Sequence, residues 1–305
     1  MAVWQATLVQ QLLAKNNFES ELVFIKSEGD IDLQTPLYEM GVQGIFTKSL
    51  DIALLNNKID IAVHSMKDVP TQLAKGTVQA AVLERASYKD IFVFKDRLII
   101  DKWQLAEATI NTPLTSGEGG IIATSSIRRK AQWLHRYPNH IVENLRGNVN
   151  TRLRKVQGHN WNGAIFAAAG LERINLRPEN AVDLDWMLPA PAQGAIMVVC
   201  REEDNFSLEA CGHFNHSDTA ICTKIERDFL RTLLGGCSTP ISALALVKED
   251  KILFRGNILS IDGKDKVEIE KTIGLKESTN LGNTAATEIL NKGADKIADA
   301  IRHAK

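Results

Sequence analysis

The spacing of apolar residues divides the chain into two parts with different expected structures. Up to about residue 204, short apolar runs alternate with segments in which apolar residues recur every three or four positions, as strands alternate with helices. From about residue 217, a long helical pattern is followed by segments in which apolar and polar residues alternate, as in antiparallel strands. The pattern predicts an α/β part followed by a separate α+β part.

The first part is expected to contain short strands and amphipathic helices. Helices are predicted over 1–15 and 48–58, and strands over 22–27, 59–65, 77–85, 90–96 and 195–204. A short strand, small polar residues and a helix with arginines in its first turns recur in three segments, 121–136, 141–156 and 163–174. Because strands that alternate with helices pair in parallel, ligands are expected at the carboxyl ends of these strands. Residues 109–120 are rich in Thr, Ser, Gly and Pro and predict a loop.

The second part begins with a predicted helix over 217–236. Ser217 or Asp218 is expected to cap its start, and two glycines end it. Three antiparallel strands are predicted to follow within 241–273, with a hairpin turn at Asp262–Gly263, and a helix over 284–303 closes the chain.

Composition places the chain among ordinary globular proteins. Its 305 residues suffice for two or three domains, and 44% of them are hydrophobic and 24% charged. No apolar run approaches the roughly 18–20 residues of a membrane helix. The N-terminal residues lack a cationic start followed by an apolar core, so we expect no secretory signal and a cytoplasmic protein. The four cysteines form no CxxC pair, which favours reduced thiols over a zinc site or a disulfide framework.

Positive charge is concentrated in the middle of the sequence. Residues 121–180 contain ten Lys and Arg against three Glu, a net charge of +7 in a chain whose net charge is −1. Thr124 and Ser126 precede a predicted helix whose first turn holds Arg128 and Arg129. Hydroxyls, free backbone N–H groups and guanidinium groups suit a carboxylate or phosphate, although a plain helix cap with two solvated arginines has the same pattern. The next two junctions between a predicted strand and the helix after it also carry arginines, namely Arg146, Arg152 and Arg173. These further arginines favour a ligand with several carboxylates.

Two other places carry candidate chemistry. The segment HSMKDVP ends a predicted strand with Ser65, Lys67 and Asp68, and a carboxylate beside a cation can act as a general acid or base. Alternatively, Asp68 only hydrogen-bonds the turn before Pro70. In LLGGCSTPI, two glycines would expose the sulfur of Cys237 as a nucleophile or an attachment point, or the cysteine is incidental.

Other functional classes have weaker support. The cysteine in IMVVC, at position 200, is expected to be a small buried hydrophobe, and the remaining two cysteines look structural. His213 and His216 lack the partners of a metal site and are expected to cap a helix or face solvent, so no metal is predicted. Aromatic residues make up 6% of the chain and the arginines form no stripe, which argues against nucleic acid as a partner.

Taken together, eight segments of this sequence resemble the porphobilinogen deaminase (hydroxymethylbilane synthase) family. They occur in the family's order and span nearly the whole chain: GDIDLQTPL, GIFTKSLDIALL, DIAVHSMKDVPT, ATSSIRRKAQ, LRGNVNTRL, AAAGLERI, LPAPAQGAI and LGGCSTPI. The resemblance implies a transferase of tetrapyrrole synthesis. It would join four porphobilinogen molecules head to tail into hydroxymethylbilane, with release of ammonia, on a dipyrromethane cofactor held by a thioether.

The resemblance also implies roles for individual residues. Cys237 would carry the cofactor, and Asp68 would be the catalytic carboxylate. Hydroxyl, ammonium and guanidinium groups would hold the acetate and propionate groups of the cofactor: Ser65, Lys67, Thr124, Ser126, Arg128 and Arg129. The substrate or the lengthening chain would be bound by Arg146, Arg152 and Arg173, and Asp30 and Gln193 match positions near the site. If the arginines stand exposed in a cleft, removing Arg128 or Arg129 should impair cofactor loading more than folding.

The resemblance implies a fold of three domains. It also implies that the protein is a monomer. Two doubly wound α/β domains, similar to two-lobed periplasmic binding proteins, would comprise residues 1–86 with 187–204, and residues 87–186. An α+β domain with a three-stranded antiparallel sheet, residues 205–305, would carry the cofactor cysteine. The family's chain begins with a strand and a Thr-Arg-x-Ser loop that would precede Met1 here, and its Gly-Gly-Lys-Gly is replaced by GVQG at 41–44.

Two hypotheses of other classes remain open from the sequence. A non-catalytic two-lobed anion-binding protein would explain the two lobes and the arginines, but not GGCSTPI or the third domain. An RNA-binding protein would bind single strands with strong salt dependence.

Overall fold

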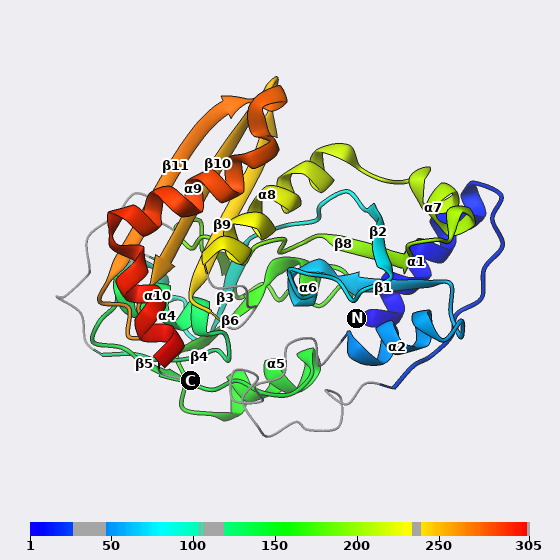
Figure 1. Ribbon diagram of the computed structural model, residues 1–305. Helices are drawn as coiled ribbons and strands as arrows, with labels where there is room; N and C mark the ends of the chain where they lie inside the picture. The colour runs from blue at the N-terminus through cyan, green and yellow to red at the C-terminus, as the bar shows by residue number, and fades with distance from the viewer. Residues whose placement is uncertain (27–46, 104, 106–118, 234–238, 304–305) are drawn as a thin grey trace.

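The computed structural model describes residues 1–26, 47–103, 105, 119–233 and 239–303. Within these residues the strands form three sheets, called here A, B and C (Figure 1). The chain passes from sheet A to sheet B through residues 83–89 and returns to sheet A through residues 184–195. Sheet C follows, built entirely from the last third of the sequence.

Sheet A is antiparallel and is buried on both faces. It pairs β1 (Ile61–Ser65) and β2 (Thr77–Val82) with the central β8 (Ile196–Arg201). Alternate side chains of β8 enter two separate cores, one containing α2 (Lys48–Leu55) and one containing α1 (Ala2–Lys15) and α7 (Asn205–Gly212). This double burial explains why the β8 sequence IMVVC is apolar without interruption.

Sheet B is mixed, with the order β5-β4-β6-β3-β7. The strands β4 (Ile121–Ala123), β5 (Ile141–Glu143) and β6 (Gly163–Ala167) are parallel, as the strand–helix alternation predicts. The strand β3 (Asp90–Phe94) is antiparallel to β6 and to β7 (Ala181–Asp183). The parallel strands are followed by α4 (Ile127–Arg136), α5 (Val149–Gly158) and α6 (Ala168–Glu172), while α3 (Leu98–Lys102) follows β3.

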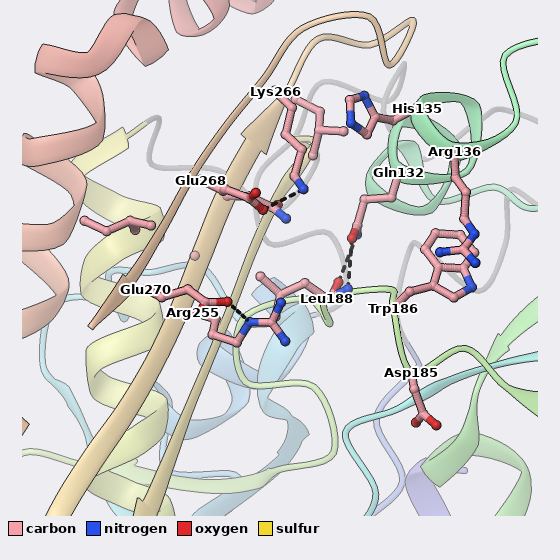
Figure 2. Close-up of a pocket in the computed structure, with 14 residues that line it drawn as sticks. Gln132, His135, Arg136, Asp185, Trp186, Leu188, Arg255, Lys266, Glu268 and Glu270 are labelled. Atoms are coloured by element: carbon pink, nitrogen blue, oxygen red, sulfur yellow. Dashed lines mark hydrogen bonds and ion pairs between the residues drawn. The ribbon is translucent and has the colours of Figure 1, made fainter. Parts of the chain in front are cut away.

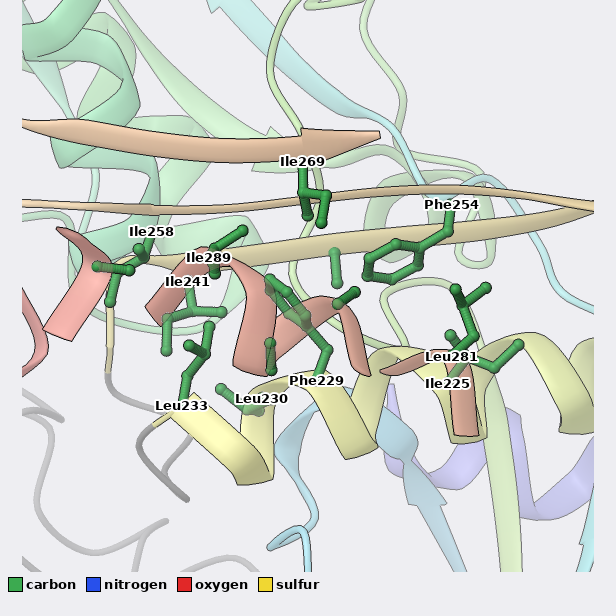
Figure 3. Close-up of a cluster of buried hydrophobic side chains, with 14 of the residues drawn as sticks. Ile225, Phe229, Leu230, Leu233, Ile241, Phe254, Ile258, Ile269, Leu281 and Ile289 are labelled. Atoms are coloured by element: carbon green, nitrogen blue, oxygen red, sulfur yellow. The ribbon is translucent and has the colours of Figure 1, made fainter. Parts of the chain in front are cut away.

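Sheet C has the predicted three antiparallel strands, in the order β11-β10-β9. They are β9 (Ile241–Lys248), β10 (Lys251–Leu259) and β11 (Lys266–Gly274), and Gly263 in the turn between the last two has φ 76°. One face packs against α8 (Ser217–Leu233) and α9 (Leu281–Ile289), and α10 (Asp295–His303) completes its core. Figure 3 shows Phe229 and Phe254 at the centre of this core, with ring centroids 5.3 Å apart.

Shorter helical turns complete the described structure. A 3₁₀ turn spans Met66–Asp68, and another spans Leu275–Asn280. The π turn Leu290–Ala294 separates α9 from α10 at Gly293, whose φ is 103°. No helix in the described ranges has the length and apolar character needed to cross a membrane.

The structure differs from the predicted local elements at the strand over 22–27 and at the start of α8. No strand forms over 22–26, where Val23 and Phe24 are 53% and 74% exposed, so this part of the predicted strand is wrong: within the described ranges, no strand pairs with this apolar run. The cap of α8 is His216, whose Nδ1 accepts a hydrogen bond from the backbone N–H of Thr219 at 3.2 Å. The loop predicted over 109–120 lies outside the described residues except for its last two. The domain limits stay a prediction.

A buried carboxylate joins the three sheets. Glu226 of α8 is fully buried and accepts hydrogen bonds from both terminal nitrogens of Arg85, at 2.6 and 3.0 Å. It also accepts from the backbone N–H groups of Ala192 at 2.6 Å and Ala245 at 2.7 Å. These donors come from the segment leaving sheet A, the segment returning to it, and β9. A charge taken out of water requires such complete pairing, so Glu226 fixes how the sheets dock.

We expect the variant Glu226→Ala to lower the free energy of unfolding by about 3–5 kcal/mol, because it leaves Arg85 buried without its carboxylate. Urea denaturation measures this change. The control is Glu288→Ala, which removes a carboxylate paired with Lys271 and Lys292 at the surface and should change stability far less. Equal losses in the two variants would contradict the role given to Glu226.

Candidate active site

The predicted cap at the start of α4 is present. Ser126 precedes the helix, and its Oγ accepts a hydrogen bond from the backbone N–H of Arg129 at 3.5 Å. Thr124, which is buried, accepts a hydrogen bond at its Oγ1 from the backbone N–H of Ser126 at 3.2 Å. These bonds shape the carboxyl end of β4 so that the first turn of α4 projects its arginines toward β3.

The two arginines of this turn are buried, contrary to the expectation that they stand exposed in a cleft. Arg128 and Arg129 are 4% and 8% exposed. Both contact Asp90, the first residue of β3: Arg128 Nη2 donates to Oδ2 at 2.7 Å, and Arg129 Nε and Nη2 donate to Oδ1 at 3.0 and 2.8 Å. Each guanidinium group also donates to a backbone carbonyl, that of Leu188 or Ile165. These arginines therefore support the fold as well as any ligand.

Asp90 was not singled out by the sequence analysis. Its side chain is completely buried and also accepts a hydrogen bond from Nε2 of Gln193 at 2.9 Å. Burial alone would raise the pKa of Asp90, but the two guanidinium groups and this amide together hold the pKa below its usual value. The one signal in the sequence is an acidic residue at the first position of a strongly apolar strand, where an ionised side chain needs a cationic partner.

Lys67 and Asp68 lie in the turn that follows β1, next to this cluster. Lys67 is half-buried, and burial lowers its pKa; the charges of Asp68 and Asp90 oppose this shift, and those of Arg128 and Arg129 add to it. Asp68 is exposed. Its side chain makes no hydrogen bond to the described part of this turn. Arg227 instead donates to the carbonyls of Val69 and Pro70 at 3.0 and 2.6 Å. The alternative that Asp68 only hydrogen-bonds the turn before Pro70 therefore has no support in the described part of the turn.

The other predicted arginines add positive charge beside Asp68. Burial, and then the charges of Arg129 and Arg146, lower the pKa of Arg152 to about 10, while the charge of Asp68 opposes this shift. Arg152 Nε donates to the carbonyl of Gly147 at 2.7 Å, which fixes it at the start of α5. Cationic neighbours that lower the pKa of Arg152 mark a region of excess positive potential, which attracts anions.

Two predicted residues are held by α1. The Oγ of Ser65 and the side-chain amide of Gln5 are hydrogen-bonded at 2.9 Å. Arg173 Nη2 donates to the carbonyl of Gly194 at 2.6 Å, and its guanidinium carbon lies 5.8 Å from the centre of the Trp4 ring. Burial lowers the pKa of Arg173. No local pattern in the sequence predicts that the N-terminal helix supports these two residues.

Cys237, Asp30 and residues 41–44 lie outside the described residues. The other three cysteines are buried, as expected for Cys200. Burial raises the pKa of Cys200, and it raises the pKa of both Cys211 and Cys222 to about 12. None of these three offers a thiolate at neutral pH, the form in which cysteine acts as a nucleophile.

A cavity of about 160 Å³ lies between α4 and sheet C (Figure 2). Its walls include Gln132 and Trp186 on one side and Arg255 on the other, and none of the predicted site residues lines it. Arg255 pairs with Glu270 at 2.7 Å, as Figure 2 shows, so the charge of this arginine is balanced locally. The cavity is separate from the arginine cluster, although the Leu188 carbonyl accepts hydrogen bonds from both Gln132 and Arg128.

The fold and the cluster define an α/β protein with a group of arginines gathered at the carboxyl ends of its strands, where proteins of this class bind ligands. Comparison with known proteins makes the assignment specific. The family model described as "Porphobilinogen deaminase, dipyromethane cofactor binding domain" matches residues 1–209, and "Porphobilinogen deaminase, C-terminal domain" matches residues 220–291. The chain belongs to the porphobilinogen deaminase family.

Relatives agree with this assignment over most of their length. Porphobilinogen deaminase of Syntrophotalea carbinolica is 37% identical over 99% of this chain and 93% of its own. The chloroplastic porphobilinogen deaminase of Pisum sativum is 40% identical over 89% of this chain and 72% of its own. Among solved structures, the probable amino-acid ABC transporter extracellular-binding protein ytmK of Bacillus subtilis is 12% identical, with a TM-score of 0.36 over 68% of this chain and 78% of its own.

Membership in this family establishes the general activity. The chain is an enzyme, a transferase of tetrapyrrole biosynthesis that forms hydroxymethylbilane from porphobilinogen on a dipyrromethane cofactor. The predictions of activity and cofactor are thereby confirmed, and the sheets described above confirm the prediction of an α/β part followed by a separate three-stranded antiparallel sheet.

Because Arg128 and Arg129 share a buried carboxylate, we expect Arg128→Ala to reduce the free energy of unfolding by on the order of 3 kcal/mol. Thermal and urea denaturation of the purified variant measure the loss. Arg154→Ala is the matched control, since Arg154 lies exposed on α5, and it should leave stability nearly unchanged. If Arg128→Ala were as stable as this control, the pairing with Asp90 would not contribute to folding.

Proposed function

We propose that the arginine cluster binds the carboxylate groups of the oligopyrrole and that Asp68, at its open edge, is the catalytic carboxylate. The observation that carries the proposal is the convergence of the first two strand–helix junctions of sheet B and the turn after β1. The charges of Arg129, Arg146 and Asp68 all act on Arg152, although these residues come from separate segments. That such a site works in a cytoplasmic monomer is part of the prediction from sequence.

The residues around the start of α4 fit a group rich in carboxylates. Arg128 Nε is buried and donates to no described residue, so the cluster has an N–H group ready for an acceptor. Hydroxyl, ammonium and guanidinium groups all donate hydrogen bonds to carboxylates. We infer that six residues hold the acetate and propionate groups of the dipyrromethane: Ser65, Lys67, Thr124, Ser126, Arg128 and Arg129. The bound cofactor supplies the primer on which the pyrrole chain grows.

The incoming substrate needs further cations. Each porphobilinogen molecule carries two carboxylates, so the chain accumulates negative charge as it grows, and one arginine pair does not balance it. Arg146 and Arg152 come from the second junction and extend the positive region beyond Arg128 and Arg129, and Arg173 follows α6 at the third junction. We infer that these three arginines bind the incoming substrate and the lengthening chain.

The exposure and surroundings of Asp68 support a catalytic role for it. Loss of ammonia from porphobilinogen leaves positive charge on the pyrrole, and a fixed carboxylate beside it lowers the energy of that state. Asp68 is exposed, so its oxygens can reach a substrate N–H, whereas those of Asp90 are fully occupied by protein donors.

The attachment point is assigned to Cys237 by its sequence motif and by the burial of the alternatives. A thioether forms when a thiolate attacks a carbon electrophile, which requires an accessible sulfur. Cys200, Cys211 and Cys222 are buried in the cores around sheets A and C. The GGC motif places Cys237 between α8 and β9, in a segment outside the described residues.

For the variant Asp68→Asn we expect product formation to fall by at least about a hundredfold, the scale of a lost acid–base group. The protein should remain folded and carry its cofactor, because Asp68 is exposed. Turnover is measured as hydroxymethylbilane release, and loading by intact mass. Asp60→Asn is the control, since Asp60 lies exposed before β1. Full turnover by Asp68→Asn would remove its catalytic assignment.

For Cys237→Ser we expect a protein that folds but carries no covalent cofactor. Serine preserves the size of the side chain but does not form the thioether. Intact mass should show an excess of two pyrrole units on the parent protein and none on this variant, with the matching loss of colour with Ehrlich's reagent. Cys200→Ser is the control and should stay loaded. Detection of the cofactor on Cys200 would overturn the choice of sulfur.

A further inference from the structure

Asp90 is an acidic residue inside a cluster whose proposed ligands are themselves carboxylates. Asp90 is the first residue of β3, whereas Arg128 and Arg129 lie in the first turn of α4, so the carboxylate and the arginines come from different elements. Such an arrangement requires explanation, because an internal carboxylate competes with the ligand for the same donors.

The hydrogen bonds show which part of each guanidinium group Asp90 occupies. On Arg129 it takes the edge formed by Nε and Nη2, at 3.0 and 2.8 Å, while Nη1 donates to the carbonyl of Ile165 at 3.2 Å. On Arg128 it takes only Nη2, at 2.7 Å, and Nη1 donates to the carbonyl of Leu188 at 2.7 Å. Arg128 Nε remains without an acceptor among the described residues. Asp90 thus fixes both groups and leaves one donor of Arg128 unused.

Asp90 also changes the charge of the arginine pair. Two guanidinium groups carry two positive charges, and a carboxylate with no exposed surface cancels one of them where solvent screens little. A pair with its full charge would hold anions more tightly, and a growing polyanion that has to shift during elongation would leave it more slowly.

We propose that Asp90 is the positioning residue of this pair: an internal counter-anion that orients Arg128 and limits how tightly the site holds carboxylates. The proposal rests on the proposed function, in which these arginines bind the oligopyrrole. Asp90 touches neither substrate nor cofactor and acts through the two guanidinium groups.

The variant Asp90→Asn separates this role from simple support of the fold. Asparagine keeps an oxygen for Arg129 and Gln193 but places an NH₂ group opposite Arg128 Nη2, and it removes one negative charge. We expect the KM for porphobilinogen, which carries a net negative charge, to fall about three- to tenfold, the effect of one charge at short range. We expect kcat to fall as well, since Arg128 loses its fixed position and the anionic chain is released more slowly.

The experiment measures kcat and KM for the loaded enzyme at two ionic strengths, after circular dichroism has shown that the variant is folded. The fall in KM should be smaller at high salt. Asp183→Asn is the matched control: Asp183 also lies in sheet B, on β7, but pairs with Lys89 and Arg177 at the surface, and both kinetic constants should stay at parent values.

An unchanged or raised KM in folded Asp90→Asn would overturn the proposal. If that variant does not fold, Asp90→Glu gives the second test, because it keeps the charge but moves the carboxylate: kcat should fall while KM stays near the parent value, and a lowered KM would contradict the proposal. Arg152→Ala distinguishes the two levels of inference. If Arg152→Ala raises the KM while Asp90→Asn does not lower the KM, only the proposed role of Asp90 is wrong. If Arg152→Ala leaves the KM unchanged, the proposed binding role of the arginine cluster is wrong as well.

Discussion

The site depends on the pairing of one buried carboxylate with two guanidinium groups. An ionised carboxylate in the interior is tolerated only when opposite charges and hydrogen-bond donors surround it. Asp90 meets this condition by drawing the first turn of α4 against the first residue of β3. The same contacts bring the carbonyls of Leu188 and Ile165 into place, so the geometry of the arginines is set by the fold and not by the ligand.

A second buried carboxylate follows the same rule at the scale of the whole molecule. Glu226 is paired with Arg85 and accepts from backbone N–H groups of the segment returning to sheet A and of β9. The two networks meet at Gln193, whose side chain donates to Asp90 and whose carbonyl accepts from Arg85. The charge pairs that dock the sheets therefore also border the arginine cluster, which links the placement of β9 to it.

Local patterns in the sequence predicted most elements and the cap at the start of α4. The apolar periodicity gave the three parallel strands of sheet B and the three strands of sheet C, because each depends on neighbours close in sequence. Small hydroxyl residues before arginines gave the cap of α4. The features that the sequence did not predict correctly depend on partners far away in the sequence. Within the residues that the structure describes, no strand pairs with the apolar run at 22–26. The pairing of Asp90 with Arg129 spans 39 residues, a contact that no local pattern encodes.

The contrast between Asp68 and Asp90 shows why the sequence pointed to one carboxylate and missed the other. Asp68 lies in a polar motif after β1, where an exposed acid beside a lysine already suggests chemistry. Asp90 opens an apolar strand and resembles the end of a loop. In the folded chain all the hydrogen-bonding partners of Asp90 come from the protein, so it serves to hold charge in place, whereas the side chain of Asp68 stays open to a ligand. The two carboxylates therefore differ in what they can contact, because Asp90 is enclosed by its protein partners and Asp68 is exposed.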